Sequence, residues 1–78
     1  MSNLYLMRRR PSKKHYDVMD SCVVNADAEF AARDYASMRH GDEGKDVWLD
    51  NNLSECLLLG KAASNIRHGI LCRDFNAG

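Results

Sequence analysis

The sequence predicts a small α+β domain in which one helix packs on a four- to five-stranded, mostly antiparallel sheet, in the order ββαβββ. Two observations lead to this prediction. Residues 26–39 carry the only strong helical periodicity, and short apolar or β-branched runs of strand length lie on both sides of them. One helix among several strands is typical of the α+β class. The length of 78 residues fits a single domain that spans residues 1–78.

The first two strands are predicted on either side of a basic segment. Leu4–Met7 is apolar throughout and suits a strand near the centre of the sheet. His15–Val24 reads as the second strand because apolar and polar residues alternate before the β-branched run that ends it. Between them, Pro11 cannot donate a ladder hydrogen bond, so Arg8–Lys14 is expected to form a loop or the mouth of a hairpin.

The helix is predicted from an apolar stripe at a period near 3.6 residues. Asn25 or Asp27 is expected to cap its first turn, and Gly41 to take the left-handed position after its last turn. Arg33 and Ser37 lie away from the stripe and are expected on the solvent side. The stripe consists of Ala28, Ala31, Ala32, Tyr35 and Met38.

Three further strands are expected after the helix. Asp46–Asp50 contains the only tryptophan, and a turn is predicted at residues 50–52 because Asp and Asn favour turns. Cys56–Leu59 and Ile70–Cys72 are short apolar runs with strand length. The residues predicted to be largely buried are Leu6, Val23, Ala32, Tyr35, Trp48, Leu58 and Ile70.

The three cysteines give no sign of catalysis or metal binding. Cys22, Cys56 and Cys72 are widely spaced and odd in number, which fits neither a disulfide framework nor a zinc site. A thiol nucleophile with a histidine base is formally possible. However, each cysteine lies in an apolar run, where burial would disfavour the thiolate. We therefore predict buried thiols, no metal, no cofactor and no enzymatic activity.

The net charge is zero, but the charges are unevenly distributed along the chain. Residues 1–16 sum to +5, residues 17–56 to −7 and residues 57–78 to +2. This asymmetry bears on partners rather than on fold. No apolar run approaches the roughly 20 residues that span a bilayer. The start of the chain also lacks a signal-peptide pattern, so a cytoplasmic protein without membrane contact is expected.

Two charged surfaces are candidates for binding. The acidic surface, Asp42, Glu43, Asp46 and Asp50, would meet a basic groove on a partner; alternatively, it is a solvated acidic turn. The basic segment with its neighbouring tyrosines would hold nucleic-acid phosphates and stack a base; alternatively, it is a solvated loop that protects a sheet edge. The basic residues are Arg8, Arg9, Arg10, Lys13 and Lys14.

Several short sequences together resemble small proteins of unassigned function that bacteriophages and prophages encode. The resemblance covers roughly residues 15–78. Its sequences are Tyr16-Asp17, Val23-Val24, Ala32-Arg33, Gly41-Asp42-Glu43-Gly44, Val47-Trp48-Leu49-Asp50, Gly69-Ile70-Leu71 and Asp74-Phe75-Asn76-Ala77-Gly78. Some phage proteins of this size are anti-CRISPR proteins, which inhibit host effector complexes by occupying a surface. They share no motif, so the resemblance assigns no functional residue.

The resemblance implies a non-enzymatic inhibitor in the cytoplasm of a bacterial host, acting as a monomer or weak homodimer. The partner would be a host protein or ribonucleoprotein complex. The most concrete expectation is an anti-CRISPR protein that binds a type I CRISPR surveillance complex and blocks its target DNA. The alternative is a small nucleic-acid-binding regulator that uses the Arg8–Lys14 segment.

Overall fold

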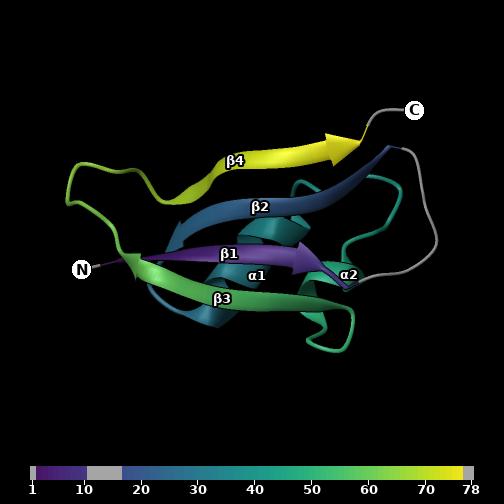
Figure 1. Cartoon of the computed structure of the whole chain (residues 1–78), viewed down its shortest axis with the longest axis horizontal. Helices are drawn as coiled ribbons and strands as arrows, with labels where there is room; N and C mark the ends of the chain where they lie inside the picture. Colours follow the sequence, from purple (N-terminus) through teal and green to yellow (C-terminus); the bar gives the residue numbers. More distant parts are fainter. Residues whose placement is uncertain (1, 11–16, 77–78) are drawn as a thin grey trace.

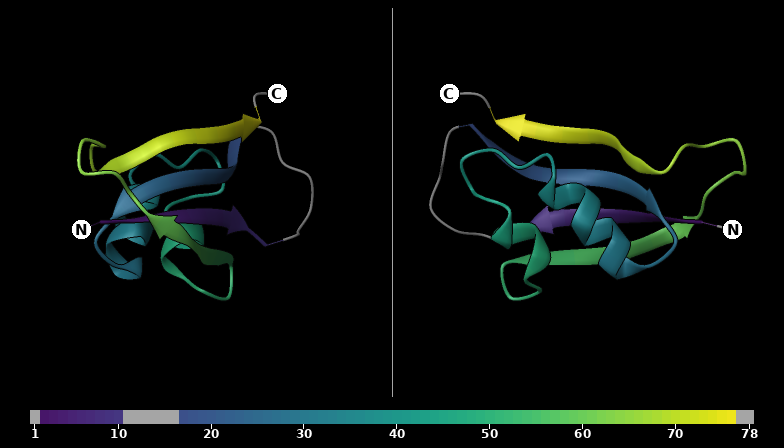
Figure 2. Two further views of the ribbon diagram at one scale, coloured as in Figure 1. Left: turned by 60° about the vertical axis from the view of Figure 1, so that its left-hand side comes forward. Right: turned by 180° about the vertical axis from the view of Figure 1, so that it is seen from behind.

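The computed structural model of the protein describes residues 2–10 and 17–76. The elements are β1 (Asn3–Arg9), β2 (Val18–Ala26), α1 (Glu29–Ser37), α2 (Asp46–Leu49), β3 (Ser54–Lys61) and β4 (Gly69–Asn76). The strands form one antiparallel sheet of order β3-β1-β2-β4. Both helices lie on the same face of this sheet (Figure 1; Figure 2). The predicted α+β class is therefore confirmed.

The two central strands carry most of the core on the face that the helices cover. Tyr5 and Met7 of β1 lie opposite Val24 and Cys22 of β2, and all four are buried. Side chains of directly opposed residues share a face, so these residues form a row under the helices. Leu6, whose neighbours along the strand face the helices, points to the other face and is only partly buried. The predicted central strand at Leu4–Met7 is thus confirmed, and β1 is longer than this prediction at both ends.

α1 lies close to the sheet because alanines, which have small side chains, point from it toward the core. Ala32 and Ala36 are fully buried against the core, whereas Met38, expected on the apolar stripe, is 64% exposed. Arg33 and Ser37, expected on the solvent side, are buried instead. Ala31, Ala32 and Tyr35 of the predicted stripe do pack against the core, so the inward face overlaps the predicted one and extends further round the helix. Arg33 can be buried because Trp48 and Ser54 accept its hydrogen bonds, and Ser37 donates to the Asp34 carbonyl oxygen of its own helix.

The predicted ends of α1 are also wrong. Ala28 occupies the N-cap position without a side-chain hydrogen bond, while Asn25 lies within β2. Gly41 does not take the left-handed conformation, which Gly44 adopts instead. A Cβ atom at Gly41 would collide with the carbonyl oxygen of Asp17 and the ring of Phe75, so glycine serves close packing there.

The strand expected at Asp46–Asp50 is a single helical turn, α2. Its backbone hydrogen bonds run from Trp48 N to Lys45 O and from Asp50 N to Asp46 O. This turn places the Trp48 ring fully inside the core while Leu49 remains half exposed. Burial of the indole ring decides the conformation here, because the β preference of a Val-Trp-Leu run is weaker than its packing context.

β3 is an edge strand, and this position corrects one core prediction. Leu58 lies opposite Tyr5 on the helix face of the sheet, yet it is 64% exposed. Among the other predicted core residues, Ala32 and Trp48 are fully buried. The rest are partly buried, namely Leu6, Val23, Tyr35 and Ile70.

The connection from β3 to β4 crosses the end of the sheet from one edge to the other (Figure 1). Asn25, fully buried at that end of β2, holds it in place by donating from Nδ2 to the carbonyl oxygens of Ile66 and Arg67. His68 adds a contact of 3.2 Å from Nε2 to the Asp27 carboxylate. The residue predicted to cap a helix thus anchors a loop.

Candidate functional site

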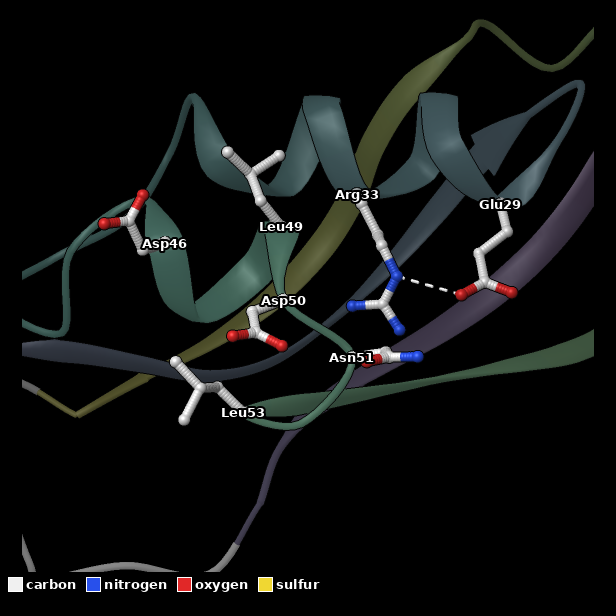
Figure 3. Close-up of a pocket in the computed structure, with 7 residues that line it drawn as sticks. All are labelled: Glu29, Arg33, Asp46, Leu49, Asp50, Asn51 and Leu53. Atoms are coloured by element: carbon white, nitrogen blue, oxygen red, sulfur yellow. Dashed lines mark hydrogen bonds and ion pairs between the residues drawn. The ribbon is translucent and has the colours of Figure 1, made fainter.

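A solvent-open hollow lies where α1, α2 and the turn before β3 meet. It has a volume of about 710 Å³ and, being wide open, suits side chains of a protein partner better than an enclosed small molecule. Figure 3 shows the side chains that surround it. They are Glu29, Arg33, Asp46, Leu49, Asp50, Asn51 and Leu53.

Arg33 forms the rigid base of this hollow. Its guanidinium group donates to Glu29 Oε2 at 2.9 Å, to the Trp48 carbonyl oxygen at 3.1 Å and to Ser54 Oγ at 2.9 Å. These bonds join α1 to α2 and to the beginning of β3. Because Arg33 is almost completely buried, its charge requires this set of partners. The only sign of this role in the sequence is the i, i+4 spacing of Glu29 and Arg33, which suits a helical ion pair but does not indicate burial.

Asp46 and Asp50 place two carboxylates on the α2 side of the hollow. Asp46 begins the helix and Asp50 follows its last residue, so one turn separates the two residues. The Asp50 Oδ1 atom accepts a hydrogen bond of 2.9 Å from the Asn52 backbone N–H. This bond fixes the predicted turn in the way that Asp side chains commonly do. Both residues are exposed and both belong to the predicted acidic surface.

The hollow combines negative charge with exposed apolar surface. Glu29, Asp46 and Asp50 against Arg33 leave a formal charge of −2. Leu49 and Leu53 are 46% and 44% exposed beside these carboxylates. Protein interfaces typically combine apolar contacts with polar groups around them. The chemistry of the hollow therefore matches a partner that offers basic and apolar side chains together.

The structure separates the other two predicted acidic residues from the hollow. Asp42 is exposed on the loop between α1 and α2. Glu43 turns inward: it accepts hydrogen bonds from Trp48 Nε1 at 2.6 Å, from Gly41 N at 2.8 Å and from Met19 N at 3.1 Å. Glu43 therefore stabilises the fold, and only half of the predicted acidic set lines the hollow.

The three arginines of the predicted basic segment are held by groups of the protein. Arg8 pairs with Glu55, and Arg9 donates to Asp20 at 2.6 Å. Arg10 donates through Nε and Nη2 to the Asn51 carbonyl oxygen at 3.1 and 3.0 Å. The remaining members, Lys13 and Lys14, lie outside the described residues. Phosphate binding would have to compete with these internal partners.

The cysteines are placed differently from one another. Cys22 is buried, Cys56 is partly buried and Cys72 is exposed, so the prediction of buried thiols holds fully for Cys22 alone. Burial raises the pKa of Cys22 to about 12 and that of Cys56 to about 11, with the Glu29 carboxylate adding to the second shift. Both thiols are therefore protonated at neutral pH, which makes them poor nucleophiles. Within residues 2–10 and 17–76, no cluster of three or more potential metal ligands is found.

No protein-family model, curated protein or solved structure matches this chain. In the part of the chain that the structure describes, no helix has the length and apolar character needed to cross a membrane.

Proposed function

We propose that this protein is a non-catalytic binding protein whose docking surface is the acidic hollow. Its partner is a basic surface on a protein or ribonucleoprotein complex that handles nucleic acid. One observation supports the proposal most directly: Asp46 and Asp50 flank exposed leucines on a base held rigid by Arg33. Carboxylates beside apolar side chains complement a groove that is built to hold nucleic acid, because such a groove is basic.

The resemblance to small phage-encoded proteins narrows this proposal. In its most specific form, the protein is an anti-CRISPR inhibitor that binds a type I CRISPR surveillance complex and prevents target DNA from binding. Its carboxylates would compete with DNA phosphates for the same cationic side chains. Opposite charges would also speed association, and the effect would weaken as salt is added.

The alternative function, nucleic-acid binding through the basic segment, receives less support. Arg8 and Arg9 already form ion pairs with Glu55 and Asp20. Releasing them would cost part of the affinity gained from a phosphate. DNA binding by the protein itself would contradict the proposal.

The experiment measures binding of target DNA to purified type I surveillance complexes in the presence of this protein. We expect the parent protein to inhibit DNA binding and the double variant Asp46→Lys, Asp50→Asn to lose this inhibition. The Asn retains an oxygen that can accept the Asn52 hydrogen bond, so the turn is preserved. Glu43 is left unchanged because its removal would disturb the fold.

A matched control changes the charge equally at other exposed acidic residues. The variant Asp34→Lys, Asp42→Asn alters two residues that do not line the hollow. We expect it to inhibit like the parent. Equal inhibition by the hollow variant, when circular dichroism shows that it is folded, would contradict the acidic hollow as the docking surface.

A further inference from the structure

β3 is an edge strand with an unusually apolar sequence. Leu57, Leu58 and Leu59 follow one another and are 40%, 64% and 55% exposed. An edge strand also presents unpaired backbone N–H and C=O groups on its outer side. Isolated exposed leucines are common in proteins, but three in succession on a free sheet edge form a surface suited to another strand.

The opposite edge of the sheet, β4, is protected against such pairing. Its second half carries the exposed charged residues Arg73 and Asp74. The Arg73 guanidinium carbon lies 4.8 Å from the centre of the Phe75 ring, and the same group donates to the Arg39 carbonyl oxygen. Charged side chains are a common means of preventing pairing between edges. The two edges therefore differ, and β3 is the one open to a partner strand.

We propose that β3 pairs with β3 of a second copy of this chain, in antiparallel orientation around Leu58. The strand has a charge pattern that is complementary to itself under a two-fold rotation. Glu55 lies three residues before Leu58 and Lys61 lies three residues after it. In the antiparallel pair, Lys61 at the end of each strand lies beside the beginning of the other strand, near Glu55. Self-complementarity of this kind is what a two-fold symmetric interface requires.

Carboxylates are present at the beginning of β3 on both faces of the sheet. Glu55 lies on the open face with Arg8, which is its cross-strand neighbour. Glu29 lies on the helix face and is joined to Ser54 through the Arg33 guanidinium group.

Lys61 lies opposite Asn3 on the helix face, because β3 has a bulge between Leu58 and Gly60. Each carboxylate already pairs with an arginine of its own chain through one oxygen, Glu55 through Oε1 and Glu29 through Oε2. Lys61 of the second copy therefore adds a second cation to a carboxylate, most directly to Glu29 on the helix face. This charge complementarity favours a second copy over a foreign strand of arbitrary sequence.

The paired strands would bury the leucines and join two four-stranded sheets into one of eight strands. A two-fold axis perpendicular to the sheet keeps the helices of both copies on the same face. Because the pairing uses both β3 edges and leaves only the charged β4 edges, it closes as a dimer and does not extend into a fibre. The inference does not rest on the proposed function. It concerns the β3 edge and not the hollow, and its test is the mass of the species that the chain forms in solution.

Sedimentation of the intact chain over a dilution series, with reductant present, tests the dimer. We expect a species of twice the chain mass of 8.8 kDa at high concentration and the monomer mass on dilution. Leu58→Lys should abolish the heavier species, because two like charges would meet at the symmetry axis. Met38→Lys is the matched control, since Met38 is also 64% exposed and lies outside β3. A single mass for the parent at every concentration would overturn the proposal, as would a dimer that survives Leu58→Lys.

A cysteine cross-link tests the register without relying on a disruptive substitution. In a Cys56→Ser, Cys72→Ser background, Leu58→Cys should form a disulfide-linked dimer under mild oxidation, because the two residues face each other across the axis. Met38→Cys in the same background should form no disulfide-linked dimer. Equal cross-linking at both positions would show random collision and would overturn the pairing around Leu58.

Discussion

Glu43 shows how one side chain can organise a small core. Its carboxylate accepts three hydrogen bonds, including one from the fully buried Trp48 ring. Glu43→Gln retains the shape but places an amide donor among N–H donors. We expect it to lower the free energy of unfolding by about 1–3 kcal/mol, the cost of an unsatisfied buried donor. Chemical denaturation followed by tryptophan fluorescence measures this loss. A variant with parental stability would show that the carboxylate does not support the indole ring.

The buried thiols predict a loss of stability in alkali. The pKa of Cys22 is raised from its ordinary value of 9.0 to about 12, because burial disfavours the thiolate. The contribution of this group is fully present below pH 9 and declines between about pH 9 and 12, where the unfolded chain releases a proton that the folded chain keeps. We expect Cys22→Ala to be less stable than the parent near neutral pH, yet to lose less stability over this alkaline range. Denaturation curves at several pH values test this, and parallel pH profiles would contradict it.

Residue roles that depend on the interior are the ones the sequence analysis predicted least well. Arg33 and Glu43 are charged residues with no local sign of burial, and only the meeting of α1, α2 and β3 supplies their partners. Asp46 and Asp50 were predicted correctly as exposed acidic residues. Their grouping with Leu49 and Leu53, however, follows from the helical turn of α2, which the sequence analysis had predicted as a strand.

At the scale of elements, a central strand and an edge strand of the sheet should respond differently to truncation. Met7 is fully buried in β1, whereas Leu58 in β3 is mostly exposed. We expect Met7→Ala to cost about 2–5 kcal/mol of unfolding free energy. Leu58→Ala should cost roughly 0.5 kcal/mol or less, as surface substitutions usually do. Denaturation midpoints at high dilution compare the two variants, and similar losses would show that β3 is covered.

The loop between α1 and α2 depends on close backbone packing at Gly41. A methyl group there would meet the Asp17 carbonyl oxygen and lie 2.8 Å from a Phe75 ring carbon. The neighbouring Asp42 N–H donates to the same carbonyl oxygen at 2.6 Å, which limits how far the loop can shift. We expect Gly41→Ala to destabilise the protein by about 1–3 kcal/mol through overpacking. The matched change is Gly44→Ala. A Cβ atom there would meet no neighbouring atom, but the residue has the left-handed backbone conformation that favours glycine.

Most strands and the main helix could be predicted from apolar runs and helical spacing. Their exact ends and the order of the strands in the sheet could not. The strands at β1, β3 and β4 and the helix α1 lie where apolar runs and helical spacing placed them. The sequence could not show that β3 lies at an edge, because edge and central strands both carry apolar runs. It also could not show that Trp48 needs a helical turn to reach the core, since that depends on the space left beside α1.

At the scale of the whole molecule, the charge asymmetry of the chain is partly neutralised by folding. Two arginines of the basic first segment pair with carboxylates of the acidic middle segment, Arg8 with Glu55 and Arg9 with Asp20. The carboxylates of Asp46 and Asp50 remain exposed in the hollow. This difference in internal pairing is why we propose the acidic hollow, and not the basic segment, as the docking surface.

A titration of the isotope-labelled protein, followed by amide chemical shifts, tests whether the acidic hollow is the docking surface. The probes are a short synthetic peptide of alternating arginine and leucine and, separately, duplex DNA at low salt. We expect the peptide to shift the amides of Leu49, Asp50 and Leu53, the shifts to vanish in the Asp46→Lys, Asp50→Asn variant, and DNA to produce none. DNA-induced shifts centred on Arg8, Arg9 and Arg10, with the hollow unaffected by the peptide, would contradict the hollow as the docking surface.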